Sequence, residues 1–361
     1  MFEDLGFQTL TAAQAVVYFA LAIGLAFGAL AQITKFCFRR MIVGDDRRGA
    51  AGVWLTALAA AMAGTQAAVT YGLISFEGHR FMDRDLPWLA IALGGLAFGA
   101  GMVLTRGCAS RLMVLGASGN LRALSVIVIF AITAHATMKG LLAPLRVSLG
   151  QLTLPVGDAA SLDALPGGGW LVTAAIVALC LVIASRSGVR PPLLIAAALL
   201  GALVPLAWIA TGFVLYDDFD VIPFESLSFT RPASDTLFWA IAGTSISPGF
   251  GTGLIGGTLL GAFVASLLTG TFQWQSFDTP RQTGRYMGGA VLMGFGGVLA
   301  GGCTVGAGLS GIPTLSLAAL LALATMALGA WATHTLLLSR LSRSSGAPGA
   351  RQAKPAAQPA Q

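Results

Sequence analysis

Long runs of apolar residues dominate the chain, and short polar or turn-forming segments separate them. A run of roughly 17 to 25 such residues is long enough to cross the bilayer core as a helix. The pattern predicts nine spans, near 14–36, 50–75, 87–106, 121–146, 169–185, 191–212, 250–271, 285–301 and 314–339. The fold class predicted from this pattern is therefore an all-α integral membrane protein.

Three segments need a separate interpretation. The stretch 235–249 is apolar but too short to cross, which favours a broken or re-entrant helix. The first apolar run follows Glu3 and Asp4 without a preceding Lys or Arg, so we expect a retained span rather than a signal peptide. Residues 341–361 are rich in Ala, Pro and Gln and are predicted to form a disordered cytoplasmic tail, which leaves 1–340 as one transmembrane domain.

Composition supports a membrane protein. Of the 361 residues, 56% are hydrophobic and only 10% are charged, whereas a soluble domain carries about 25% charged residues. The 47 glycines fit as well, since small residues let membrane helices approach closely. The formal charge of +6 could indicate a nucleic-acid partner. The cations lie in short loops between spans, where they act as topology signals, and this excludes that class.

The distribution of Lys and Arg predicts an orientation. With the N-terminus outside, 16 of the 21 cations fall on the inner side, a strong positive-inside bias. The five on the outer side are Arg80, Arg84, Lys139, Arg146 and Arg231. We therefore expect a multi-pass protein of the bacterial inner membrane, with a periplasmic N-terminus and a cytoplasmic C-terminus.

An internal repeat marks the region where chemistry is expected. Residues 94–108 read GGLAFGAGMVLTRGC, and residues 289–303 read GAVLMGFGGVLAGGC. With a shift of 195 positions, three glycines, one leucine and the terminal Gly-Cys pair coincide. The repeat ends at Cys108 in one copy and at Cys303 in the other, so both thiols become candidates for function.

The two copies lie on spans that cross the membrane in opposite directions. Inverted repeats of this kind place the substrate near the midplane, where broken helices aim backbone N–H groups at an anion. We expect two halves, about 14–146 and 235–339, linked by spans 169–212. We also expect Ala109–Gly119 and Thr304–Pro313 to fold back as short re-entrant helices, because their glycines permit close backbone approach.

A further cysteine completes a resemblance to a known family. Cys37 ends the first span in a Phe-Cys-Phe motif. With the two Gly-Cys motifs and the glycine-rich spans, the chain resembles the YeeE/YedE family of sulfur transporters over residues 14–339. The resemblance implies an hourglass of two inverted halves. It also implies uptake of thiosulfate through a central line of three cysteines, at Cys37, Cys108 and Cys303.

The chain departs from the family pattern in two respects. Ala307 stands where some members have a histidine, and no soluble sulfur-carrier domain follows the last span. Transport of another sulfur or selenium species therefore remains an alternative. Partners implied by the resemblance are the sulfur anion, the lipid bilayer and a soluble cytoplasmic sulfur-carrier protein.

The motifs single out a set of candidate residues. The substrate-binding candidates are Cys37, Cys108, Cys303, Gly107, Gly302, Ser110 and Thr304. Arg106 and Arg111 are candidates for a cytoplasmic vestibule, with topological anchoring as their alternative role. Cys180 has only apolar neighbours and is interpreted as a packed small hydrophobe. For His135 and His334, a hydrogen bond between helices and a functional role both stay open.

Thiols suit a soft anion. Moving thiosulfate through hydrocarbon would cost tens of kcal/mol if nothing replaced its water. A neutral thiol is a weak donor with polarizable sulfur, which matches a soft terminal sulfur better than a hydrated oxyanion. Apolar surroundings disfavour the thiolate, which would repel the dianion. We expect weak contacts passed along the three thiols, without covalent intermediates.

The sequence argues against two other function classes. A membrane thiol oxidoreductase needs closely spaced cysteine pairs, whereas the four cysteines here show no CxxC spacing. A soft-metal transporter normally has acidic or histidine-rich loops and a Cys-Pro-Cys ligand set, which this sequence lacks. It also lacks a nucleotide-binding P-loop. We therefore predict a transporter rather than an enzyme, without cofactor or metal.

Overall fold

The computed structural model describes residues 11–164, 168–217 and 221–345. Within these ranges, nine helical segments are long and apolar enough to cross a membrane. They are Ala12–Val43, Arg47–Thr70, Trp88–Ala117, Leu121–Lys139, Gly168–Ser185, Pro191–Val214, Phe250–Leu268, Pro280–Thr314 and Leu317–Ser339. The predicted class, an all-α multi-pass membrane protein, is confirmed.

The helices differ greatly in length. The long helices are α1 (Ala12–Thr34), α3 (Arg47–Thr70), α4 (Trp88–Leu104), α6 (Leu121–Lys139), α8 (Gly168–Ser185), α9 (Pro191–Ile209), α11 (Phe250–Leu268), α12 (Pro280–Leu299) and α13 (Leu317–Ser345). The shorter α-helices are α2 (Phe38–Val43), α5 (Ala109–Ala117), α7 (Ala143–Gly150) and α10 (Thr230–Ala242). The remaining elements are the π-helices η5 (Ala210–Val214) and η6 (Thr304–Gly311), the 3-10 turns η2 (Arg80–Met82), η3 (Gly157–Ala160), η4 (Leu162–Ala164) and η7 (Ile312–Thr314), and the antiparallel pair β1 (Asp85–Leu86) and β2 (Leu154–Pro155).

Polar residues at the helix starts explain several boundaries. Thr11 and Gln14 form a capping box at α1, and the Asp46 carboxylate accepts the Gly49 N–H at 2.9 Å at the start of α3. Each cap satisfies backbone donors that have no partner within the helix. Asn120 caps α6 in the same way. These side chains account for where the helices begin between the apolar runs.

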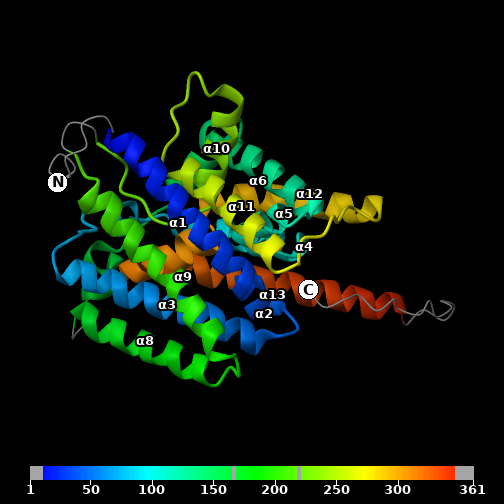
Figure 1. Cartoon of the computed structure of the whole chain (residues 1–361), viewed down its shortest axis with the longest axis horizontal. Coiled ribbons are helices and arrows are strands. Elements are labelled where there is room, and N and C mark those ends of the chain that lie inside the picture. Colours follow the sequence, from blue (N-terminus) through cyan, green and yellow to red (C-terminus); the bar gives the residue numbers. More distant parts are fainter. Residues whose placement is uncertain (1–10, 165–167, 218–220, 346–361) are drawn as a thin grey trace.

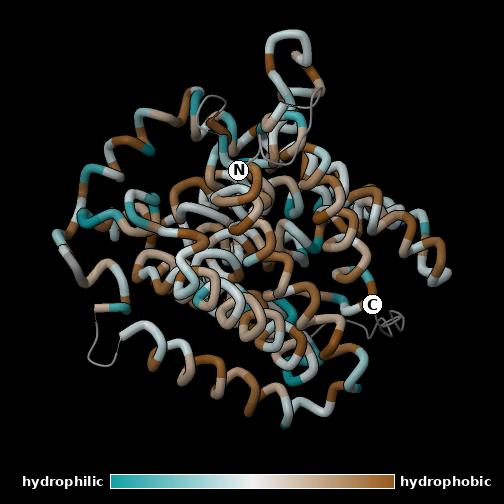
Figure 2. Tube along the Cα trace, turned by 60° about the vertical axis from the view of Figure 1, so that its left-hand side comes forward, coloured by the Kyte–Doolittle hydropathy of each residue, from teal (hydrophilic) through white to brown (hydrophobic). Residues whose placement is uncertain are grey.

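The exterior of the bundle is apolar. Hydrophobic residues continue along the outer helices (Figure 2), and large exposed side chains include Leu171 on α8 and Ile195 on α9. In water such a surface would drive association. A bilayer is the solvent that fits it. α8, at one edge of the bundle, packs mainly on α3 (Figure 1).

Two sets of helices pack reciprocally. α1 packs on α11 as α3 packs on α9, and α4 packs on α13 as α12 packs on α6. The short elements follow the same rule, since α5 packs on α6 and η6 packs on α13. The contacts are therefore preserved when each helix of one set is exchanged for its equivalent in the other: α1 for α9, α3 for α11, α4 for α12 and α6 for α13. This is the packing expected of the two repeated halves, and we propose that the second half begins at α9 rather than near residue 235.

The repeated glycines form the interface between α4 and α12. A Cβ atom placed on Gly101 would lie 2.5 Å from the Gly289 carbonyl oxygen, and one on Gly94 would lie 2.8 Å from that of Gly296. With the shift of 195, Gly94 corresponds to Gly289 and Gly101 to Gly296. Gly101 therefore contacts Gly289, the equivalent of Gly94, and Gly94 contacts Gly296, the equivalent of Gly101. Since the order of these contacts reverses along the two helices, α4 and α12 run antiparallel. The two copies of the repeat motif therefore pack against each other.

Several predicted boundaries change. The span predicted over 121–146 ends at Lys139, because Gly140 interrupts it before α7. The short helix expected in 235–249 begins earlier, at Thr230, and ends at Ala242. α13 continues to Ser345, into the predicted tail, while 346–361 lie outside the described residues.

Candidate functional site

Each of the three candidate cysteines lies at the start of a short helical element. Cys37 is the N-cap of α2, Cys108 the N-cap of α5, and Cys303 the N-cap of η6. All are buried, with exposed fractions of 7%, 0% and 0%. α5 and η6 lie where the sequence predicts the short helices Ala109–Gly119 and Thr304–Pro313. The backbone N–H groups of their first turns have no partner within the helix and form a partial positive charge.

Cys37 and Cys108 are brought together. The Cys108 Sγ lies 3.9 Å from the Cys37 Sγ and 3.5 Å from the Ser110 Oγ. The thiols are free, and so are the other cysteines of the described ranges. Two thiols and a hydroxyl, all buried, form a polar group of weak donors at the junction of α1, α2 and α5. The sequence analysis named these three residues, but not their contact.

Cys303 occupies the equivalent position in the second copy of the repeat. Its Sγ accepts a hydrogen bond from the Gly306 N–H at 3.4 Å, across the first turn of η6. Gly302 precedes it and is also buried, and a Cβ there would lie 3.0 Å from the Ala307 nitrogen. Thr304 is buried beside it, with an exposed fraction of 1%. The second Gly-Cys motif therefore forms a tight turn that leaves little room for a side chain at Gly302.

The two candidate vestibule arginines lie in different settings. Arg106 is exposed and has φ = 61°, the left-handed conformation that Gly301 adopts at the equivalent position with φ = 75°. Arg111 lies deeper and donates to the Ala31 carbonyl at 3.4 Å and the Gln32 side chain at 3.5 Å. Its guanidinium is within electrostatic range of Cys37 and Cys108. Gly107 lies between Arg106 and Arg111 in the sequence, and its Cα faces the Leu112 side chain.

A cluster of arginines surrounds Arg285. Arg39, Arg106 and Arg281 lie near enough to Arg285 to repel its charge. Within the described part of the chain, the Nε atoms of Arg39 and Arg285 are buried without a hydrogen-bond partner. Cations gathered this way create a potential that attracts anions.

The remaining candidates have structural surroundings. Cys180 is buried on α8, as its apolar neighbours predict. The His135 Nδ1 lies 3.0 Å from the Ser234 Oγ, and its ring stacks on Phe238 at 3.6 Å. This histidine therefore joins α6 to α10. His334 lies half-buried on α13.

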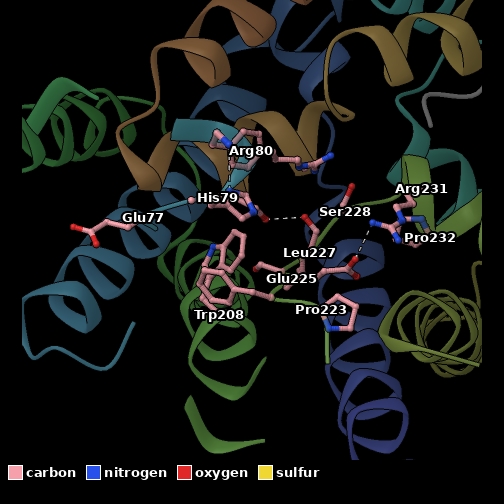
Figure 3. Close-up of a pocket in the computed structure, with 16 residues that line it drawn as sticks. Glu77, His79, Arg80, Trp208, Pro223, Glu225, Leu227, Ser228, Arg231 and Pro232 are labelled. Carbon is pink, nitrogen blue, oxygen red and sulfur yellow. Dashed lines mark hydrogen bonds and ion pairs between the residues drawn. The ribbon is translucent and has the colours of Figure 1, made fainter. Parts of the chain in front are cut away.

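A cavity that the sequence analysis missed lies between η2, the end of α9 and the start of α10 (Figure 3). Its volume is about 420 Å³, and its lining includes Arg80, Glu225, Ser228 and Arg231. Gly306 also lines it, so it reaches the η6 turn that holds Cys303. The sequence analysis treated both arginines as minor exceptions to the charge bias.

Ser228 is the counterpart of Cys37 in the reciprocal packing. α2 packs on α3 as α10 packs on α11, so the segment before α10 corresponds to the one before α2. Residues 36–40 read FCFRR and residues 227–231 read LSFTR. A Cβ on Gly306 would lie 2.6 Å from the Ser228 Oγ. The Ser228 hydroxyl thus lies against the start of η6, as the Cys37 thiol lies against the start of α5.

No group of three His, Cys, Asp or Glu side chains in the described ranges comes together in a way that could hold a metal ion. The polar groups at the buried turns are single thiols, hydroxyls and backbone N–H groups. Arginines lie both at the cavity beside η6 and in the cluster around Arg285. Together with these arginines, the weak donors at the turns suit a small anion.

Comparisons with known proteins agree with this chemistry. A family model described as sulphur transport matches residues 33–332. The chain is 25% identical to the thiosulfate transporter TsuA of Escherichia coli (strain K12), over 90% of this chain and 95% of that protein. It is also 25% identical to the thiosulfate transporter TsuA of Spirochaeta thermophila (strain ATCC 700085 / DSM 6578 / Z-1203), over 90% of this chain and 100% of that protein. The predicted resemblance is confirmed: the chain belongs to the sulphur transport (YeeE/YedE) family, whose members are transporters rather than enzymes.

Proposed function

We propose that this protein carries thiosulfate across the bacterial inner membrane into the cytoplasm, with Cys37, Cys108 and Cys303 as a relay of uncharged thiols. The observation that carries the proposal is the pair of free, buried thiols 3.9 Å apart at the start of α5. The names of the two relatives support the substrate, since both are thiosulfate transporters.

The relay replaces the water that a dianion loses on entering the membrane. Backbone N–H groups at the starts of α5 and η6 face the negative charge, and the thiols contact the soft terminal sulfur. Each contact is weak, so the ion can leave as well as enter. A thiolate would repel the dianion, so the proposed relay requires the thiols to stay protonated. Gly107 and Gly302, together with Ser110 and Thr304, complete the path in this proposal.

Release is proposed on the side of the arginine cluster. Arg106 and Arg111 belong to a vestibule with Arg39 and Arg285, and this basic surface draws the anion toward the cytoplasm. A soluble sulfur-carrier protein is the proposed recipient of the released anion, because the basic surface around these arginines favours an acidic partner.

The substrate is tested with purified protein in liposomes and radiolabelled thiosulfate. We expect saturable uptake that excess unlabelled thiosulfate suppresses at about tenfold lower concentration than sulfate, since roughly 1.4 kcal/mol of preference for the soft sulfur gives that factor. Empty liposomes are the control. Equal inhibition by sulfate would contradict a site built for soft sulfur, and absence of uptake would remove the proposed substrate.

The orientation is tested with reporters fused after Gln361. The inner side is predicted to hold 16 of the 21 Lys and Arg residues. We therefore expect a C-terminal green fluorescent protein to be bright and a C-terminal alkaline phosphatase to be inactive. Active phosphatase with dark fluorescent protein would reverse the direction of the pathway.

A further inference from the structure

The cavity beside η6 contains opposed charges from separate segments. Arg80 comes from η2, Glu225 from the segment before α10, and Arg231 from α10 itself (Figure 3). The Arg231 Nη1 lies 3.4 Å from the Glu225 Oε1, and its Nε lies 3.3 Å from the Asp235 Oδ2. The Glu225 side chain is 25% exposed, whereas that of Arg231 is 60% exposed. Glu225 is thus a partly buried counter-ion paired with the more exposed guanidinium of Arg231.

Both arginines act on the same carboxylate. Arg80 and Arg231 each interact electrostatically with Glu225, although they come from opposite halves of the chain. The Glu225 carboxylate is paired with the Arg231 guanidinium and lies within electrostatic range of the Arg80 guanidinium. Guanidinium binds a carboxylate and a small oxyanion in the same geometry, so the carboxylate occupies a position that an oxyanion could take. Glu225 therefore marks where an external anion would bind.

We propose that this cavity is the outer recognition site for the transported dianion, and that the Glu225 carboxylate is a resident counter-ion which the anion displaces from Arg231 and Arg80. The proposal rests on the transport function and outer orientation proposed above. Its ligand class is a small divalent sulfur oxyanion, whose oxygens take the place of the carboxylate oxygens.

The cavity leads toward the relay. Ser228 and Gly306 both line it, and the Gly306 N–H donates to the Cys303 Sγ at 3.4 Å. An anion released from Arg231 would meet the Ser228 hydroxyl and the first turn of η6 next. A counter-ion at the entrance keeps the arginines from holding the anion too tightly, which is what conduction through several weak sites needs.

Displacement of a carboxylate makes the site sensitive to acid. Burial raises the pKa of Glu225, against the opposing charges of Arg231 and Arg80, while Asp235 adds to the rise. As pH falls, Glu225 takes up a proton above the usual range for glutamate and frees the arginines. Burial and the Arg80 charge lower the pKa of His79 to about 4, so this ring stays neutral above pH 5. Anion affinity should therefore increase as pH falls from 7.5 to 5.5, through Glu225.

The test measures the KM for thiosulfate in liposomes at equal internal and external pH, so that no proton gradient forms. For wild type we expect the KM to fall between pH 7.5 and 5.5, a range in which thiosulfate stays a dianion. Glu225→Gln should lower the KM roughly fivefold at pH 7.5 and flatten the profile, as expected for loss of one competing ion pair. Arg231→Gln should raise the KM about tenfold at every pH, as expected for loss of a charge-assisted contact.

Glu77→Gln is the matched control. Glu77 borders the same cavity, but its carboxylate points away from the two arginines (Figure 3), so we expect wild-type KM and pH profile. A flat wild-type profile, or a Glu225→Gln variant that behaves like wild type, would overturn the proposal even if thiosulfate is transported.

Calorimetric binding of thiosulfate to the purified proteins separates this inference from the transport function. Tighter binding by Glu225→Gln than by wild type supports the outer site whether or not the liposomes take up thiosulfate. Equal binding by the two proteins overturns it, while lack of liposome uptake by wild type counts against the transport function alone.

Discussion

Replacing Cys108 by alanine is expected to reduce thiosulfate uptake about 100-fold, because losing a contact that replaces the water of a buried anion costs roughly 3 kcal/mol. Cys108 is fully buried and contacts both Cys37 and Ser110. Its removal leaves the path without a sulfur at the start of α5. Initial rates of labelled uptake in liposomes, normalised to the amount of reconstituted protein, measure the effect.

Two further variants make this result specific. Cys303→Ala should cause a similar loss, whereas Cys180→Ala removes an equally buried thiol on α8 and should leave uptake unchanged. Cys108→Ser keeps a donor but replaces polarizable sulfur by hard oxygen, so it should reduce the preference for thiosulfate over sulfate. Full uptake by a well-folded Cys108→Ala protein would contradict the relay.

Replacing Gly296 by leucine is expected to prevent stable folding. A Cβ there would lie 2.5 Å from the Gly94 carbonyl oxygen and 2.5 Å from the Phe98 nitrogen, both backbone atoms of α4. Neither atom can move without shifting the helix, so overpacking should cost about 3 kcal/mol or more. The yield of monodisperse protein after detergent extraction and its melting temperature measure this loss.

Gly288→Leu is the control on the same helix. Nothing lies within 4 Å of a Cβ at Gly288, so a leucine there should leave yield and melting temperature near those of wild type. If both variants behaved alike, the seam between α4 and α12 would not depend on the repeated glycines.

Much of the fold follows from the sequence because a bilayer imposes simple rules. Backbone groups in hydrocarbon must be paired within the helix, so apolar runs of sufficient length become spans. The repeated glycines pointed to close helix packing, since helices in lipid approach closely where their residues are small, and Gly101 and Gly289 do lie at the contact between α4 and α12. The ends of individual helices were harder to predict from the sequence. Gly140 ends α6 before α7, a break that the apolar run over 121–146 conceals.

The candidate site was predicted only in part. The repeat singled out Cys108 and Cys303, but the contact between Cys37 and Cys108 joins residues 71 positions apart. That contact depends on how α1, α2 and α5 pack, which no local pattern specifies. The N-cap placement of all three thiols likewise emerges only when the short helices are seen.

The cavity beside η6 was missed because its signal in the sequence is weak. The match between FCFRR at 36–40 and LSFTR at 227–231 retains only the second phenylalanine and the final arginine. It becomes meaningful once α10 is known to pack on α11 as α2 packs on α3. Arg80, Glu225 and Arg231 line one cavity in the folded chain, whereas in the sequence they resembled ordinary loop charges.

The most direct test of the thiol relay is a structure of the protein with selenosulfate, in which selenium replaces the terminal sulfur and can be located by anomalous scattering. We predict selenium within about 4 Å, van der Waals contact, of the Sγ atoms of Cys108 and Cys37 or of Cys303. Selenium bound away from all three thiols, or bonded covalently to one of them, would contradict transport by weak contacts with uncharged thiols.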